Sequence, residues 1–423
     1  MANCSVQNLS AWPQFLSNHQ GICNFSPSST LGCKVGSSLG LDTCTAGLDF
    51  TKICDSLKYS NTQTVEQSDS GLYVSSELQI DFDIGTIIPS LPDDISKTIL
   101  GLAGKDDLPT MGLVSKSWNA VIRSKEFYKI RRDMGTTESC LYALTLSEDG
   151  CKTSWREFNS VRNEWKELIP MPGPLKNGSG FAVVNGKLLV IGGAVDGYKA
   201  TAVADVLVYD TSLNRWHKVA SMHTARYEFA CAVLNGLVYV VGGHGLDGKK
   251  LSNVEVYDPE QDLWMELPSL RRARWGCIAG GLGGKLYVMA GRSSFTIGHS
   301  RRIDIFDPMK GQWEEAKNGC MMVLTHAIVD QELFCIEWKN DRKLAVFNAI
   351  DNSWKSVSVP LAGSCKMGFY LANVNEKLVL FPTSSEVPCD TLIYDPHAPS
   401  DCRWQTIEFK PLGTCICCTT LEA

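Results

Sequence analysis

Side chains that could perform covalent chemistry are present in this chain but are not grouped in the patterns that catalysis requires. The seven histidines show neither an HExxH motif nor a close pair that would bind a catalytic metal. The glycines of Gly280–Gly284 are interpreted as a hairpin turn, because no GxxxxGK[ST] motif of a phosphate-binding loop occurs. Ser147-Glu148-Asp149-Gly150 occurs once and is also interpreted as a turn. We therefore expect a protein without catalytic residues, metal or organic cofactor.

Recognition by charge and stacking is indicated instead by a cation that recurs along the chain. Aligned copies of a repeat place a Lys or Arg at one position, and an aromatic residue follows two of these cations. Arg, Tyr and Trp are enriched at the energetic centres of protein interfaces. We expect this position to bind an acidic or aromatic protein segment; alternatively, the cation satisfies carbonyl or acidic groups of its own repeat. The candidate residues are Lys176, Arg226, Tyr227, Glu228, Arg274, Trp275 and Lys366.

The repeat that positions these cations is clearest in Asn235–Trp264. It holds an Asn-Gly turn, an apolar run, Gly242-Gly243, Tyr257-Asp258 and finally Trp264. Short apolar runs between such turns are typical of β-hairpins, and a period of about 50 residues built from short strands indicates propeller blades. We expect each Trp to fill the wedge between blades and the glycines to allow close passage of the chain. The copies end at Trp165, Trp216, Trp264, Trp313, Trp354 and Trp404.

The first copy and the last segment of the chain complete one another. Residues 140–168 supply three strand-like runs but no inner strand, and Thr414–Thr420 has no partners after it. If the terminal run joins the first copy, six complete blades form and the ring has no open edge. The alternative is a frayed tail.

The diglycine, Tyr-Asp and Trp of these copies resemble kelch repeats. The resemblance covers residues 138–423 and is strong in three copies, whereas Glu337-Trp338 and Pro382-Thr383 replace the diglycine in two others. It implies a six-bladed kelch β-propeller, closed by the C-terminal strand, that binds a protein through its loops.

A short helical segment is predicted before the repeats, at residues 87–134. Ser90 is expected to cap a helix with Pro92 in its first turn, and Ile95, Ile99 and Leu102 mark one apolar face. Further short helices are expected at residues 107–114, 115–122 and 126–132. So few helices bury little apolar surface, and another protein would have to cover what stays exposed.

Three parts of this segment resemble an F-box: Leu91-Pro92-Asp93-Asp94-Ile95, Leu108 and Val114-Ser115-Lys116-Ser117-Trp118. An F-box followed by kelch repeats is a known plant arrangement. The resemblance implies that the segment binds a Skp1-like adaptor and, through it, a cullin–RING ubiquitin ligase. The alternative is a helical cap on the propeller, and Trp118 could belong to its core. The contacting or supporting positions that the resemblance implies are Leu91, Pro92, Ile95, Ile99, Leu108, Val114, Trp118 and Ile122.

Composition restricts the remaining possibilities. Residues 1–86 are rich in Ser, Thr, Asn and Gly and are predicted to be a disordered tail. The net charge of -6 argues against nucleic acid as a partner, and no apolar run of about 18 residues predicts a membrane span. Thiols such as Cys231, Cys277 and Cys335 lie in strand patterns, which is typical of a reduced cytoplasmic and/or nuclear protein.

The sequence thus predicts a multidomain α plus all-β protein: a disordered tail, a short helical F-box and a six-bladed kelch propeller. The function implied is that of a substrate-recognition subunit of an SCF ubiquitin ligase, whose F-box binds the adaptor and whose propeller binds an unidentified protein substrate. Two alternatives stay open, a ligase-independent kelch scaffold and a propeller enzyme.

Overall fold

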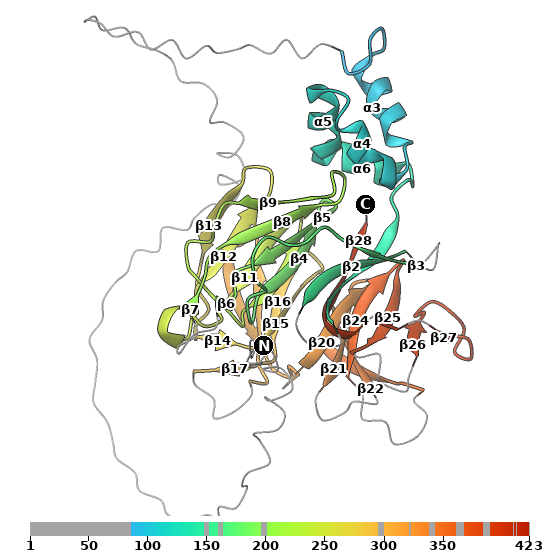
Figure 1. Ribbon diagram of the computed structural model, residues 1–423. Helices are drawn as coiled ribbons and strands as arrows, with labels where there is room; N and C mark the ends of the chain where they lie inside the picture. Colours follow the sequence, from blue (N-terminus) through green and yellow to red (C-terminus); the bar gives the residue numbers. More distant parts are fainter. Residues whose placement is uncertain are drawn as a thin grey trace, which may run out of the picture. The chain divides into compact units, whose positions relative to one another are not determined.

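The computed structural model describes residues 86–147, 152–159, 164–195, 201–294, 300–320, 323–337, 343–360, 368–383, 390–408, 410–411 and 413–422. Helices occupy the first part of this range and strands the rest (Figure 1). The predicted tail lies outside the described residues except for Thr86, and Lys366 lies outside them as well.

The helical part consists of short elements. They are α3 (Asp93–Gly101), the 3-10 helix η1 (Lys105–Asp107), α4 (Leu108–Met111), α5 (Lys116–Arg123) and α6 (Lys125–Asp133). Ser115 and Ser124 cap α5 and α6 by accepting the backbone N–H of Trp118 and Phe127. None of the described helices is long and apolar enough to cross a bilayer.

The prediction that Ser90 caps the first helix is wrong. Ser90 has φ 69° and lies in a turn in which Leu91 N donates to Ile88 O. The helix begins two residues later than a Ser90 cap requires, and Pro92 occupies the N-cap position without a side-chain hydrogen bond. Because the Pro92 ring fixes φ near the helical value, it starts the helix without a hydroxyl cap.

Six four-stranded antiparallel sheets follow the helices, and each forms one blade. In order across each sheet, blade 1 holds β28 (Thr414–Glu422), β1 (Ser139–Leu146), β2 (Thr153–Asn159) and β3 (Glu164–Glu167), and blade 2 holds β4 (Gly180–Val184), β5 (Lys187–Ile191), β8 (Val206–Asp210) and β9 (Arg215–Val219). Blade 3 holds β10 (Ala230–Leu234), β11 (Leu237–Val241), β12 (Val254–Asp258) and β13 (Leu263–Leu267), and blade 4 holds β15 (Ile278–Leu282), β16 (Lys285–Met289), β18 (Ile303–Asp307) and β19 (Gln312–Ala316). Blade 5 holds β20 (Val323–Val329), β21 (Glu332–Glu337), β22 (Lys343–Asn348) and β23 (Ser353–Ser358), and blade 6 holds β24 (Phe369–Val374), β25 (Lys377–Pro382), β26 (Thr391–Tyr394) and β27 (Trp404–Ile407).

Short additional elements decorate the loops of blades 2 to 4. They are the two-stranded ribbons β6 (Ala194–Val195) with β7 (Thr201–Ala202) and β14 (Arg274–Trp275) with β17 (Arg292–Ser293), and the 3-10 helix η2 (Leu246–Gly248).

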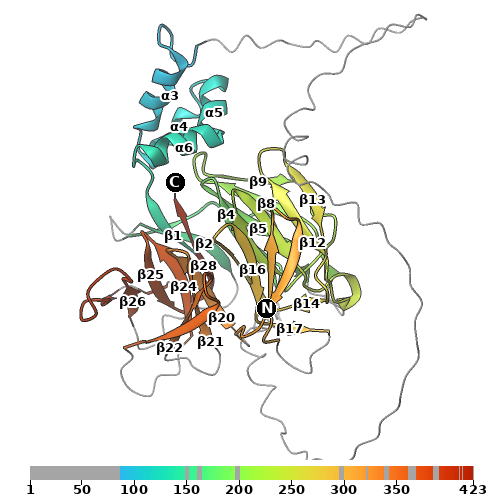
Figure 2. The same cartoon turned by 180° about the vertical axis from the view of Figure 1, so that it is seen from behind.

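The ring closes through the two ends of the strand region. β28 lies beside β1 (Figure 2) and pairs with it antiparallel, so that Cys418 lies opposite Ala143 and Leu421 opposite Cys140. Leu421 is completely buried and Cys415 nearly so. The prediction that the C-terminal run completes the first blade is therefore confirmed, and with it the count of six blades.

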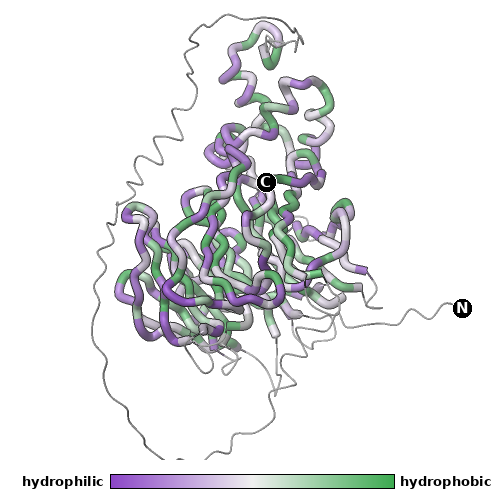
Figure 3. The backbone as a smooth tube through the Cα atoms, turned by 90° about the vertical axis from the view of Figure 1, so that its left-hand side faces the viewer, coloured by the Kyte–Doolittle hydropathy of each residue, from purple (hydrophilic) through white to green (hydrophobic). Residues whose placement is uncertain are grey.

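The repeated Trp and Gly residues join neighbouring blades. The Tyr257 and Trp264 rings lie 5.0 Å apart, and Trp264 Nε1 donates to Ala220 O in the segment that enters blade 3. A Cβ at Gly243, where φ is 95°, would lie 2.6 Å from Tyr227 O. Both predicted roles are confirmed in this copy. In Figure 3, apolar stretches run along the strands and polar ones gather at the turns. The core lies between adjacent sheets: Val208 of blade 2 and Val238 of blade 3, for example, belong to the same hydrophobic cluster.

Candidate interaction sites

An uncovered apolar surface lies on the helical part. Ile95 and Ile99 of α3 are each 45% exposed and Leu102, after the helix, is 64% exposed; these residues follow the i, i+4, i+7 spacing of one helix face. Leu113 and Val114, which precede α5, are 84% and 63% exposed. Grouped exposed apolar side chains of this kind mark interaction surfaces. We call these five residues the apolar face.

The predicted adaptor-binding positions divide into two sets. Ile95, Ile99 and Val114 belong to the apolar face, and Pro92 beside them is exposed. Leu91 is half-buried. The apolar face also includes Leu113, for which the sequence carries no signal because the turn after α4 has no helical period.

The second set of predicted positions packs inside the helical part and consists of Leu108, Ile122 and Trp118. Leu108 and Ile122 are 1% and 2% exposed and pack with Leu100 and Phe127. Trp118 is half-buried, packs against the same cluster and donates from Nε1 to Ile87 O at 2.7 Å.

Buried polar contacts tie the helices to blade 1. Lys105 Nζ donates to the Tyr142 hydroxyl at 2.8 Å and forms an ion pair with the Glu157 carboxylate. All three residues are buried, and burial raises the pKa of Tyr142 well above its usual value. Leu213, in the turn between β8 and β9, joins the hydrophobic cluster of the helices. The helical part is thus docked by both a buried charge and apolar packing.

These contacts involve one end of the blades. Leu213 lies in the β8–β9 turn, Glu260, which pairs with Lys125, lies in the β12–β13 turn, and Gly186, which faces Tyr128, lies in the β4–β5 turn. In an antiparallel blade these turns share one end, which we call the turn end. The diglycines that follow β5 and β11 occupy the opposite, glycine end.

Two of the predicted cations are buried inside their blades. Arg226 is 0% exposed and donates to Gly242 O, to Asn253 O and to the Glu255 carboxylate. Burial lowers the pKa of Arg226, and the Glu255 carboxylate opposes that shift.

Arg274 is 1% exposed and bonds Ala290 O, Arg302 O and Asp304 in the same manner. Both guanidinium groups therefore satisfy carbonyl and acidic groups of their own blades, which was the alternative interpretation, and neither is available to a partner.

The residues that follow these cations come together at the glycine end. The Tyr227 and His244 rings stack at 5.1 Å, the His244 and Trp275 rings lie 5.4 Å apart, and Lys250 Nζ lies 4.7 Å from the Trp275 ring centroid. Glu228 Oε2 is 3.4 Å from His244 Nδ1. We call these five residues the aromatic cluster. The sequence suggested Tyr227, Glu228 and Trp275 but not His244 or Lys250, because the path of the β11–β12 loop follows no pattern.

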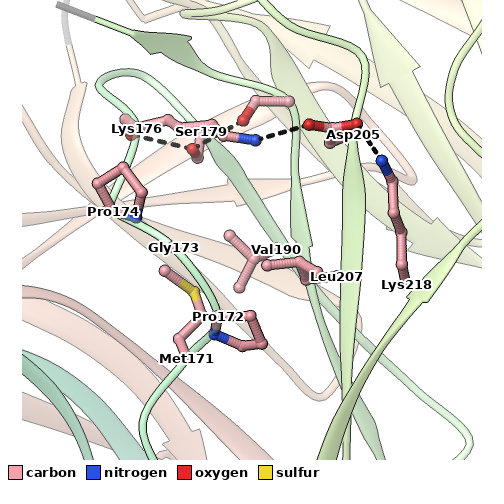
Figure 4. Close-up of a pocket in the computed structure, with 11 residues that line it drawn as sticks. Met171, Pro172, Gly173, Pro174, Lys176, Ser179, Val190, Asp205, Leu207 and Lys218 are labelled. Atoms are coloured by element: carbon pink, nitrogen blue, oxygen red, sulfur yellow. Dashed lines mark hydrogen bonds and ion pairs between the residues drawn. The ribbon is translucent and has the colours of Figure 1, made fainter.

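Lys176 is half-buried and lines a cavity of about 290 Å³ at the glycine end of blade 2 (Figure 4). Its Nζ lies 3.2 Å from Asp205 Oδ2, and Lys218 Nζ lies 2.7 Å from Asp205 Oδ1. These cations, chiefly Lys218, lower the pKa of Asp205. Among the predicted cations within the described residues, Lys176 is the one with a partly exposed ammonium group.

Known proteins share both parts of this architecture. Residues 88–130 match the F-box domain, and residues 141–386 match the family described as FKB95, Kelch-repeats domain. An F-box/kelch-repeat protein of Arabidopsis thaliana is 47% identical over 358 residues, which cover 84% of this chain and 95% of the relative. A second, putative F-box/kelch-repeat protein of the same plant is 33% identical over 338 residues, covering 77% and 94%.

The chain therefore belongs to the F-box/kelch-repeat family. An F-box joined to a kelch propeller indicates a protein of the substrate-adaptor type, with a Skp1-type partner at the F-box and a protein substrate at the propeller.

Proposed function

We propose that this protein is the substrate-recognition subunit of an SCF (Skp1–cullin–F-box) E3 ubiquitin ligase. The apolar face carries the proposal: five large apolar side chains stay exposed on a helical part whose Leu100, Leu108, Ile122 and Phe127 are packed inside. Leaving such a surface in water is costly unless a partner covers it, at about 25 cal/mol for each Å² of apolar area. A Skp1-like adaptor is the partner that the F-box implies.

The separation of the two sites along the blades supports the same function. The helices contact the turn end, whereas the aromatic cluster and the Lys176 cavity lie at the glycine end. Adaptor and substrate can then bind at the same time, and the buried Lys105 ion pair keeps their separation constant. A scaffold of this kind accelerates ubiquitin transfer by proximity. We place the protein in the cytoplasm or nucleus, where thiols such as those of Cys231 and Cys277 would stay reduced.

Adaptor capture by the full chain tests the proposal. The double change Ile95→Ser and Ile99→Ser removes the centre of the apolar face without touching the packed side of α3, and we expect it to weaken capture of a Skp1-like adaptor by at least tenfold, roughly 1.4 kcal/mol or more.

Lys97→Ala is the matched control, because Lys97 lies on the other side of α3 in an exposed ion pair with Glu126 and contributes little. Poor capture by wild type and variant alike would contradict the ligase role and favour a scaffold that works without the adaptor.

A further inference from the structure

The cavity of blade 2 exists because this blade departs from its neighbour at equivalent positions. Leu207 stands two residues before Tyr209, as Glu255 stands two residues before Tyr257. In blade 3 the buried Glu255 carboxylate accepts the backbone N–H of His223 and of Thr224, at 2.7 and 3.1 Å, and pairs with Arg226. This ion pair fills the end of blade 3.

Blade 2 lacks the carboxylate of that arrangement, one of its two backbone donors and its arginine. Leu207 provides no carboxylate, and Pro174, which precedes Lys176 as Thr224 precedes Arg226, has no N–H to donate. The shorter Lys176 side chain turns to Asp205 at the rim, and a cavity of about 290 Å³ that both residues line stays open. The differences at Pro174 and Leu207 are chemically consistent with one another, since one backbone donor is lost together with the acceptor, while Gly173, at the position of His223, keeps its N–H.

The lining of this cavity combines positive charge with an apolar floor. The ammonium groups of Lys176 and Lys218 share the single carboxylate of Asp205, so that one net positive charge remains. Each ammonium has three N–H donors, and Asp205 accepts from both. Val190 and Leu207 lie below them, facing the same space (Figure 4). Lys218 is 61% exposed and can be reached from solvent.

We propose that this cavity binds the acidic side chain of a substrate segment, with the carboxylate accepting from the N–H donors of Lys176 and Lys218 that Asp205 leaves open and the methylene stem on Val190 and Leu207. A Glu side chain has this composition. A carboxylate brings one negative charge and neutralises the site, whereas a phosphate brings about two and leaves an excess of negative charge beside Asp205. The inference rests on the proposed function, because it names the kind of residue that the propeller selects.

Binding of short peptides to the full chain tests this assignment. The probes are acetylated and amidated dodecamers with one fixed position, occupied by Glu, Gln, Lys or phosphoserine, and random residues elsewhere. We expect the Glu pool to bind at least tenfold more tightly than the Gln pool in wild type. The preference should fall severalfold in Lys218→Gln, which changes an exposed residue, and stay unchanged in Lys249→Gln, an exposed control that does not line the cavity.

A second variant fills the cavity of blade 2 with the arginine–glutamate ion pair that blade 3 has at the equivalent positions. Pro174→Thr, Lys176→Arg and Leu207→Glu together reproduce the buried pair of blade 3 and should abolish the Glu preference in a chain that melts like wild type. An equal Glu preference in wild type, Lys218→Gln and the filled variant would overturn the inference, as would a preference for phosphoserine over Glu. Capture of the Skp1-like adaptor is measured on the same preparations. If wild type prefers Glu but does not capture the adaptor, the ligase proposal is contradicted while the cavity assignment is supported.

Discussion

At the scale of single residues, the buried pair of Arg226 and Glu255 should be a main stabilising contact of blade 3. Arg226→Met leaves the Glu255 carboxylate, 1% exposed, without its cation. Breaking a buried ion pair from one side costs about 3–5 kcal/mol, and urea titration should show a decrease of that size in the free energy of unfolding.

The paired change Arg226→Leu and Glu255→Leu, which imitates Leu207 of blade 2, should recover part of the loss because no buried charge is left alone. Equal stability of wild type and the Arg226→Met variant would contradict this account.

The sequence predicts which side chains recur but not which atoms they meet. The repeat placed Arg226 and Arg274 at equivalent positions, and their partners Glu255 and Asp304 also recur, two residues before Tyr257 and Phe306, but a repeat does not say that these two positions contact one another. Tyr227 and Trp275 could be predicted to lie near one another because equivalent positions surround one end of a ring. His244 enters between them from a loop, where packing rather than periodicity sets the position.

At the scale of secondary-structure elements, β28 should determine whether the ring is stable. A chain that ends at Gly413 lacks the nine residues of this strand, including buried Cys415 and Leu421, and leaves the edge of β1 unpaired. We expect the midpoint of thermal unfolding to fall by roughly 10 °C or more, since 1 kcal/mol corresponds to about 2–4 °C in a domain of this size.

Circular dichroism melting and size-exclusion chromatography measure the loss of stability and the aggregation that an open edge promotes. Glu422→Gln serves as the control that keeps the strand. A truncated chain that melts at the same temperature as the full chain would show that closure contributes nothing.

Strands were more predictable than helix starts. Even blade 6 forms β25 and pairs it with β26, although Pro382-Thr383 replaces the diglycine, because the continuous apolar run of β25 and the Tyr394–Trp404 contact suffice to specify the sheet. The first helix start was misplaced because Ser90 and Pro92 are both common near helix starts, and only the backbone conformation distinguishes a turn from a cap.

At the scale of the whole molecule, the docking of the helices should depend on Lys105 more than on the covalent link. Gly135 is exposed and has φ 67°, and a Cβ added at this residue would meet no atom within 4 Å, so that added Gly/Ser residues have room there, beside Thr136, which is hydrogen-bonded to Arg131 and Gly101. We expect the insertion alone to leave amide hydrogen exchange in η1 and α4 unchanged.

Combining the insertion with Lys105→Met and Glu157→Met removes the buried ion pair without leaving a lone charge. Amide protection in η1 and α4 should then fall by about tenfold or more, as expected for a locally released unit. Faster exchange with the insertion alone would mean that the short link, and not the buried contact, holds the helices.

The number of blades and their closure followed from the repeat, but the docking of the helices could not be predicted. Lys105 lies in a short segment with no period, and nothing in its neighbourhood in the sequence signals the distant Glu157. Contacts between domains rest on the match of two surfaces, and a pattern within one segment describes only that segment.

Closure by β28 also has a consequence for how the protein is made on the ribosome. Roughly 270 residues separate β1 from its last partner, and at about 5–20 residues per second a nascent β1 waits roughly 15–50 s before its neighbour has been synthesised. During that interval one edge of the first sheet is open to other polypeptides. Chaperones that shield nascent chains should therefore crosslink to β1 on ribosomes stalled before β28 has emerged, and release β1 once β28 pairs with it.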